Sequence, residues 1–210
     1  MKLIIESWRE FLKEEVLSEA AVDNIDRYGL LVYPSMNNPE YVIIYNYLMA
    51  KPSLRKMNYD QIERTHQAIL KLRFNNSKNS LEVDQIWGKS GFGPTLYRIA
   101  GQIAKQNNVA GIMPSAVKGE ISDEAKSVWS NFYSGIGSSY LEATPYEGNH
   151  DEDHLNSIYS LKDGSNTISL DKAVANSQRT LSTEQHKNAI LDTADNVLGR
   201  AMQRVYGDTN

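Results

Sequence analysis

The stretch from Leu81 to Asn108 constrains the fold of this chain more than any other segment. Residues 81–87 alternate and are rich in bulky apolar side chains, which predicts a β-strand. A glycine turn follows at once, with the sequence Gly88-Lys89-Ser90-Gly91-Phe92-Gly93. Pro94 then stands where a first helical residue belongs, because its φ angle is already set and no amide hydrogen is needed there. Apolar residues at helical spacing continue this helix to Asn108.

The start of this helix has the properties of an anion-binding site. The free amides between Phe92 and Thr95, including that of Gly93, would point out of the first turn, and the helix dipole favours negative charge there. Glycine at position 91 lets the backbone approach a ligand because no Cβ is in the way, and Lys89 adds a cation. The alternative is a tight connection without a ligand, because short glycine motifs have many chance matches and no Gly-Lys-Ser/Thr closes this one as in a P-loop.

Two further strands are predicted beside this segment. Residues 69–74 alternate, and the polar turn 75–80 joins them to residues 81–87, so the two strands form an antiparallel hairpin. Residues 109–114 read as a short buried strand after the helix, and a strand–helix–strand unit is parallel and right-handed. We therefore predict a mixed sheet in which 69–74 and 81–87 are antiparallel neighbours and 110–113 is parallel to the latter.

Two carboxylates, Glu82 and Asp84, point the same way from the 81–87 strand. A carboxylate within reach of a reacting amine can act as a general base. Alternating carboxylates also occur on the solvated face of a sheet. The sequence leaves both interpretations open.

Composition excludes several classes of function. A length of 210 residues is typical of one domain. The net charge of −4 does not indicate the basic surface that a nucleic-acid-binding protein needs. The absence of cysteine excludes disulfides, thiolate metal sites and cysteine nucleophiles. No apolar run approaches the length of a membrane span, so neither nucleic acid nor membrane is an expected partner. The run from His150 to His154 is charged throughout, but it lacks further ligands, which favours a charged loop over a metal site.

The pattern of residues 1–20 predicts an amphipathic helix, which either docks on the domain or serves as a targeting signal. This leader resembles the capsid-targeting peptides of internal head proteins in T4-like phages, which a head-maturation protease cuts after Leu/Ile-x-Glu. Leu17-Ser18-Glu19 matches that motif. The resemblance implies cleavage after Glu19, contact with capsid proteins and the protease, and a location in the phage virion interior; the host cytoplasm is the other location expected.

From Tyr28 to Tyr159 the order of expected elements resembles the GNAT family of acetyl-CoA-dependent N-acetyltransferases. That fold runs strand, helices, antiparallel meander, phosphate-binding turn and helix, parallel strand, another helix and a closing hairpin. The family's pyrophosphate loop, Gln/Arg-x-x-Gly-x-Gly/Ala, falls on the glycine turn. Gly91 and Gly93 match the loop, whereas Gly88 replaces the usual Gln or Arg.

A second family motif, Asn-x-x-Ala followed by an apolar residue and a tyrosine, lies over residues 122–129. Trp129 stands where the family often has the tyrosine that protonates the leaving thiolate, and Tyr133 follows one turn later as the substitute. More closely, residues 90–97 and 121–129 resemble a GNAT-like protein group of tailed phages.

This resemblance implies an α/β (α+β) fold with a GNAT-like mixed sheet flanked by helices. It divides the chain into the leader 1–20, a GNAT-like domain 21–162 and a C-terminal helical extension 163–210, which would either cover an open sheet edge or mediate assembly. The implied activity is transfer of an acetyl group from acetyl-CoA to the amine of a small molecule or a protein. The implied catalytic residues are Glu82, Asp84 and Tyr133, and acetyl-CoA would contact Lys89, Gly91, Phe92, Gly93 and Thr95.

Two alternatives belong to other classes of function. One is a phage internal head or virion-associated protein that has the fold without catalysis. The other is a regulatory binding module unrelated to phages.

Overall fold

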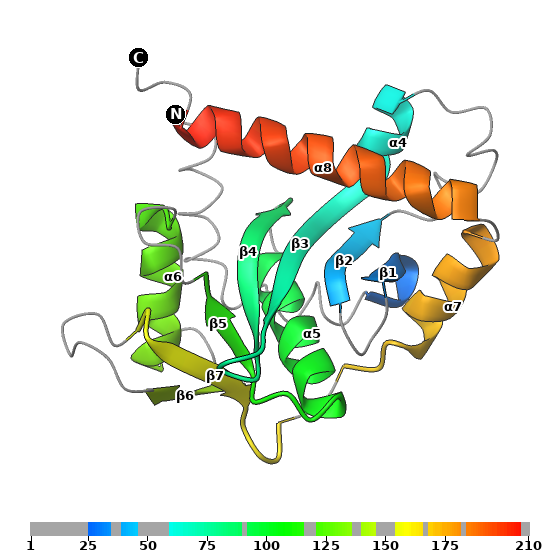
Figure 1. Cartoon of the computed structure of the whole chain (residues 1–210). Helices are drawn as coiled ribbons and strands as arrows, with labels where there is room; N and C mark the ends of the chain where they lie inside the picture. Colours follow the sequence, from blue (N-terminus) through cyan, green and yellow to red (C-terminus); the bar gives the residue numbers. More distant parts are fainter. Residues whose placement is uncertain are drawn as a thin grey trace.

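The computed structural model describes residues 25–34, 39–45, 59–89, 92–115, 121–135, 140–145, 154–165, 168–181 and 184–206 (Figure 1). The leader with its cleavage motif, Gly91 and residues 150–153 lie outside these ranges. The elements follow one another as η2 (Ile25–Arg27), β1 (Gly29–Pro34), β2 (Pro39–Tyr45), α4 (Tyr59–Thr65), β3 (His66–Asn75), β4 (Ser80–Gly88), α5 (Gly93–Gln106), β5 (Ile112–Pro114), α6 (Asp123–Tyr133), β6 (Leu141–Pro145), β7 (Ser157–Leu161), α7 (Asp171–Thr180) and α8 (Glu184–Tyr206).

The strands form one seven-stranded mixed sheet with the order β1-β2-β3-β4-β5-β7-β6. All neighbouring strands are antiparallel except β4 and β5, which are parallel. The predicted hairpin of β3 and β4 and the parallel placement of β5 are therefore confirmed. The mixed α/β class, with helices flanking the sheet, is also confirmed.

The register of the β3–β4 hairpin contains one irregularity that matters for the site. Lys71 pairs with Gln85 and Leu72 pairs with Val83, so Asp84 has no partner of its own on β3. This is the arrangement of a β-bulge, in which an extra residue on one strand locally redirects the side chains. The alternating pattern of residues 81–87 predicts a regular strand and does not reveal it.

The sheet is covered on both faces by helices. On one face, apolar residues of the strands pack with α5, α6 and α7 around a core that includes Leu70, Leu81 and Leu96. On the opposite face a second core joins β2 and β3 to α4 and α8 through Ile43, Ile69 and other buried residues. Because side chains alternate along a strand, β2 contributes to both cores.

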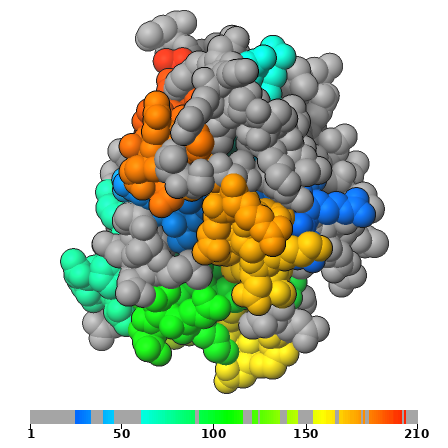
Figure 2. Space-filling model, turned by 90° about the vertical axis from the view of Figure 1, so that its right-hand side faces the viewer, coloured from blue at the N-terminus to red at the C-terminus, as the bar shows by residue number. Residues whose placement is uncertain are grey.

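The two C-terminal helices belong to these cores and lie on opposite faces. In Figure 1, α8 crosses the molecule beside β2, β3 and β4, and Figure 2 shows α7 in the middle of another side of the molecule. α7 contacts the edge strand β1, and Asn176 on α7 donates hydrogen bonds to the carbonyl oxygens of Asp26 and Tyr28. α7 thus packs against the edge strand β1 on one face of the sheet, and α8 covers the opposite face.

The connections depart from the element order that the GNAT resemblance implies. Only residues 35–38 separate β1 from β2, which is too short for the helices that the family carries after its first strand. A helix, α4, instead lies between β2 and β3, and α7 and α8 supply the cover from the end of the chain.

Local signals in the sequence set several boundaries. Ser122 caps α6 by accepting a hydrogen bond from the amide of Ala125 at 3.2 Å, as its position predicts. The strand expected at 109–114 is shorter, from Ile112, because the amide of Val109 donates to the carbonyl of Ala104 and closes α5. The amide of Ala110 still donates to the carbonyl of Asn79 in the β3–β4 turn, next to the β4–β5 pairing that begins with Leu81 and Ile112.

His66 joins α4 and α8 at the start of β3. Its fully buried ring places Nδ1 3.2 Å from the carbonyl oxygen of Ile62 and Nε2 3.1 Å from that of Ile190. Burial lowers the pKa of His66 below its ordinary value, and the neighbouring carbonyl oxygens oppose that shift only in part. A neutral imidazole has a single N–H, so it can donate to one of the two carbonyls.

This shift predicts that acid weakens the fold through His66. Because the folded-state pKa is lowered below 6.5, the unfolded chain binds more protons in the pH range just below that value. The free energy of unfolding should therefore fall as the pH drops below 6.5 towards the folded-state pKa. Urea denaturation measures the free energy of unfolding at about pH 7.5 and at about pH 5.5. Between these two pH values, this free energy should fall less in His66→Gln than in the wild type. An equal loss in His66→Gln and in the wild type would contradict the assignment.

Candidate functional site

The candidate site lies where β4 and β5 separate. Their parallel pairing covers Leu81 with Ile112, Glu82 with Met113 and Val83 with Pro114, and β4 then continues to Gly88 paired with β3 on its other side. In Figure 1 the ribbon of β4 extends past the arrowhead of β5. α5 begins at Gly93, directly after the turn that leaves β4. Ligands of open α/β sheets often bind at the carboxyl ends of strands beside such a helix start.

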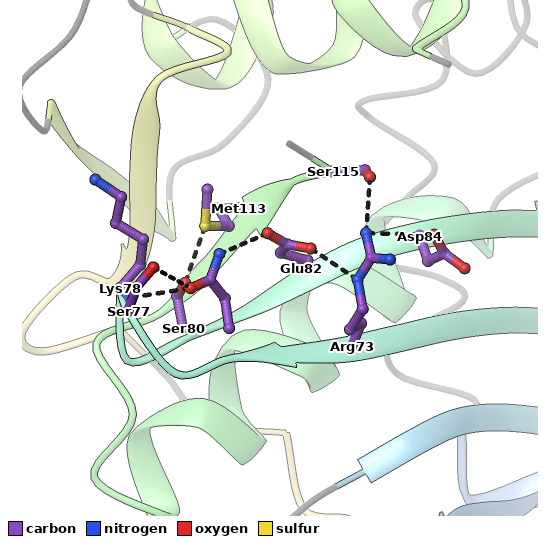
Figure 3. A network of polar contacts seen from close by, with 9 residues as sticks. Arg73, Ser77, Lys78, Ser80, Glu82, Asp84, Met113 and Ser115 are labelled. Atoms are coloured by element: carbon purple, nitrogen blue, oxygen red, sulfur yellow. Dashed lines mark hydrogen bonds and ion pairs between the residues drawn. The ribbon is translucent and has the colours of Figure 1, made fainter. Parts of the chain in front are cut away.

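A polar network occupies this point of separation, and Arg73 is its centre (Figure 3). Arg73 lies on β3 directly opposite Glu82 on β4, and its Nε donates to Glu82 Oε2 at 2.9 Å. Asn75 Nδ2 donates to the other carboxylate oxygen of Glu82 at 2.6 Å. The side chain of Glu82 is only 6% exposed. Both of its oxygens therefore have a donor, which compensates the cost of burying the charge.

The same guanidinium also reaches β5 and the bulge. Nη2 of Arg73 donates to Ser115 Oγ at 3.3 Å and lies 3.9 Å from Asp84 Oδ1. The side chains of Arg73 and Asp84 are 51% and 30% exposed. Arg73 thus connects β3 and β4 to Ser115, the residue that follows β5, and Asp84 is the carboxylate of this network that solvent can reach.

This geometry separates the roles of the two carboxylates. The structure brings Glu82 and Asp84 to one guanidinium, but the interpretation of both as a solvated face is wrong for Glu82, because Arg73 and Asn75 bury and neutralise it. Glu82 is also a poor candidate for the base, since its oxygens are already occupied.

Sequence reasoning missed Arg73, Asn75 and Ser115 as members of the network. A signal for Arg73 was present, because counting outward from the turn pairs Asn75 with Ser80 and then Arg73 with Glu82. For Ser115 the sequence holds no such signal, because its contact depends on how β5 packs beside β4.

The start of α5 differs from the expected anion cradle at Phe92. The amide of Phe92 donates to the carbonyl of Lys89 at 3.1 Å, and the amide of Lys89 donates to Gln67 on β3 at 2.8 Å. The ring of Phe92 is buried and packs edge-on against Tyr28. The expectation that the Phe92 amide faces a phosphate is therefore corrected, because a nearby carbonyl already accepts its hydrogen.

The remaining groups at this helix start are Gly93, Thr95 and the side chain of Lys89. Pro94 has no amide hydrogen, so Gly93 and Thr95 supply the other amides of the first turn. The side chain of Thr95 is fully buried, and its hydroxyl has no hydrogen-bond partner among the described residues. Lys89 is exposed at the end of β4, and partial burial lowers the pKa of its ammonium group. Gly91 lies outside the described residues.

An aromatic cluster fills the space around Trp129 on α6. Its ring centroid lies 4.9 Å from that of Tyr159 and 5.3 Å from that of Tyr97, and Phe132 packs edge-on against both Trp129 and Tyr97. Trp129 is 2% exposed. The position at which the resemblance implies a catalytic phenol is therefore part of a closed aromatic core.

Tyr133 does not join the Arg73 network. It is the last residue of α6, it is 41% exposed, and its electrostatic neighbour is Tyr159 on β7. The hydroxyl of Tyr159 lies 2.6 Å from the carbonyl of His154 and 3.1 Å from that of Trp129, and burial raises its pKa. The structure thus brings together Glu82 and Asp84 among the expected catalytic residues, and leaves Tyr133 apart.

Metal and membrane features were sought in the described ranges. Those ranges contain no cluster of three or more His, Asp or Glu side chains that would hold a metal ion. None of the helices described there combines the length and apolar character needed to cross a membrane.

Comparison of the chain with models of protein families, with curated proteins and with solved structures finds no match.

Proposed function

We propose that this chain is a GNAT-type N-acyltransferase that uses acetyl-CoA and acts where β4 and β5 separate. One observation carries the proposal: the only parallel pair of the described sheet stops pairing after Val83 and Pro114, and α5 begins beside the end of β4. The antiparallel meander before this point and the β6–β7 hairpin after it also agree with the GNAT order. The short β1–β2 connection departs from that order.

The start of α5 is the place proposed for the pyrophosphate of the donor. The helix dipole favours an anion there, and the amides of Gly93 and Thr95 with the ammonium of Lys89 would hold it. Because Pro94 has no amide and the Phe92 amide already donates to Lys89, fewer donors remain than a full family loop has. We therefore expect acetyl-CoA to bind more weakly than to a family member with the complete motif.

Asp84 is the residue proposed to accept the proton. It is partly exposed, it lies at the bulge just past the last β4–β5 pair, and Arg73 leaves it only a 3.9 Å contact. Acetyl-CoA supplies a thioester; in the overall reaction a nitrogen–carbon bond forms, the carbon–sulfur bond breaks and the amine loses one proton. With Trp129 buried, solvent would return a proton to the released thiolate.

The first test measures binding and turnover separately. Calorimetry should detect acetyl-CoA binding with a dissociation constant below about 1 mM, on the order of −4 kcal/mol. Release of coenzyme A in the presence of an amine panel should fall roughly 100-fold or more in Asp84→Asn, because general bases contribute on that scale. Acetyl-CoA affinity should stay unchanged in that variant, since Asp84 lies away from the proposed phosphate contacts.

Asp163→Asn is the matched control, because this carboxylate is fully exposed on the turn after β7 and pairs only with Lys105 among the described residues. Its turnover should equal that of the wild type. Absence of acetyl-CoA binding at millimolar concentration would refute the acyltransferase proposal.

The second candidate is a non-catalytic phage internal head or virion-associated protein of the same fold. The burial of Trp129 in the aromatic cluster favours a non-catalytic role, and Leu17-Ser18-Glu19 at the end of a leader of the capsid-targeting type favours this candidate over a regulatory module. Intact-mass analysis of virion material should then find a chain that begins at Ala20.

A further inference from the structure

The network at the β4–β5 separation has unused hydrogen-bonding capacity on Arg73. A guanidinium carries five N–H donors. The described contacts use Nε for Glu82 and Nη2 for Ser115 and Asp84, and none of them involves Nη1. With its side chain 51% exposed, Arg73 can offer Nη1 to a solute from solvent.

Asp84 has unused accepting capacity beside it. Its Oδ1 faces Arg73 at the long distance of 3.9 Å, and no described contact involves Oδ2. Figure 3 shows Arg73 and Asp84 side by side, with Glu82 on the other side of the guanidinium. Because Glu82 already receives two hydrogen bonds, the accessible part of the network is one cationic edge next to one carboxylate.

We propose that this pair recognises an acceptor that carries an amine and a carboxylate close together, as a free amino acid does. The amine would lie at Asp84 and the carboxylate would receive hydrogen bonds from Arg73, since a planar guanidinium matches a carboxylate in geometry and charge. This inference rests on the proposed acyltransferase function, because it assigns the acceptor to the same site. It goes beyond that function by naming the substrate class.

Electrostatics favour such a zwitterion over a simple amine. Glu82, Asp84 and Arg73 together carry one net negative charge, which attracts an ammonium group but leaves the Arg73 cation nearby to repel it. A carboxylate on the ligand removes that repulsion by pairing with Arg73. The carboxamide of the same amino acid keeps the amine but has no carboxylate to pair with Arg73.

The test compares each amino acid with its own carboxamide. Their dissociation constants for the full-length protein would be measured by calorimetry or ligand-observed NMR, with acetyl-CoA absent and with it present. In the wild type, at least one amino acid should bind about 10-fold or more tightly than its carboxamide, which corresponds to roughly 1.4 kcal/mol. Arg73→Gln should bring that ratio close to one.

Two further variants separate recognition from folding. Arg73→Lys keeps the charge and the partner for Glu82, so it should stay folded and lose most of the preference, because an ammonium group that pairs with Glu82 has no second nitrogen to offer the ligand carboxylate. Arg179→Gln changes an exposed arginine on α7 and should keep the full preference. Urea denaturation of each variant confirms that the compared proteins are folded.

The outcomes distinguish this inference from the proposed function. Equal binding of all amino acids and their carboxamides in the wild type, or an unchanged ratio in folded Arg73→Lys, overturns the inference. If acetyl transfer occurs but no amino acid binds more tightly than its carboxamide, this inference is overturned and the proposed function stands. Preferred binding of an amino acid without any acetyl transfer supports the ligand site and refutes the transferase.

Discussion

Gly111→Ala is expected to destabilise the protein by about 3 kcal/mol or more, because a Cβ at this position has no space. A methyl group built on Gly111 would lie 2.5 Å from the carbonyl oxygen and 2.8 Å from the carbonyl carbon of Tyr159. Both atoms belong to the backbone of β7, so rotation of a side chain cannot relieve the overlap. On its other side Gly111 accepts a hydrogen bond from the amide of Leu81, which holds it against β4.

The measurement is urea or thermal denaturation, in which a loss of this size lowers the melting temperature by roughly 6–12 °C for a chain of this length. Gly199→Ala is the matched control. It lies inside α8, and among the described residues nothing outside the helix's own backbone lies within 4 Å of the added methyl group, so it should stabilise by about 0.5–1 kcal/mol through helix propensity. Equal stability of the two alanine variants would show that β5 and β7 are not packed as described.

Arg73→Met is expected to cost about 2–3 kcal/mol, because it leaves the buried carboxylate of Glu82 with Asn75 as its remaining partner. Removing one partner of a fully buried pair costs about 3–5 kcal/mol. The smaller value follows from the exposure of Arg73, since water can reach the vacated position. The double variant Arg73→Met/Glu82→Gln should recover much of the loss, because no buried charge is then left unpaired and the partly exposed Asp84 is hydrated.

A double-mutant cycle in urea measures this coupling between Arg73 and Glu82. Lys105→Met is the control, because Lys105 pairs with a fully exposed carboxylate on Asp163, and its denaturation midpoint should match that of the wild type. A double variant as unstable as Arg73→Met alone would mean that Arg73 stabilises the fold through other contacts.

The sequence alone predicted those features that depend on residues close together in the chain. Alternation and a polar turn predicted the β3–β4 hairpin, and the glycine turn with Pro94 predicted that α5 follows β4 directly. Ser122 predicted the start of α6 because its hydroxyl caps a helix within its own turn. The parallel placement of β5 followed from the handedness and length of a strand–helix–strand unit.

The candidate site was predicted only in part, for a physical reason. Glu82 and Asp84 were found because they share a strand, but their difference in burial depends on Arg73, on the bulge at Asp84 and on where β5 ends. The Phe92 amide could not be assigned, because its acceptor on Lys89 depends on the path of the turn.

The tertiary structure also decided where the C-terminal helices lie. Their apolar stripes show that each must be covered, and the periodicity of a helix is the same whichever face of a sheet it packs against. The placement of α7 against β1 and of α8 on the opposite face depends on complementary contacts such as Asn176 with Asp26 and His66 with Ile190. These partners lie more than a hundred residues apart, so local sequence patterns determine which residues form elements, and long-range packing determines which of those elements meet.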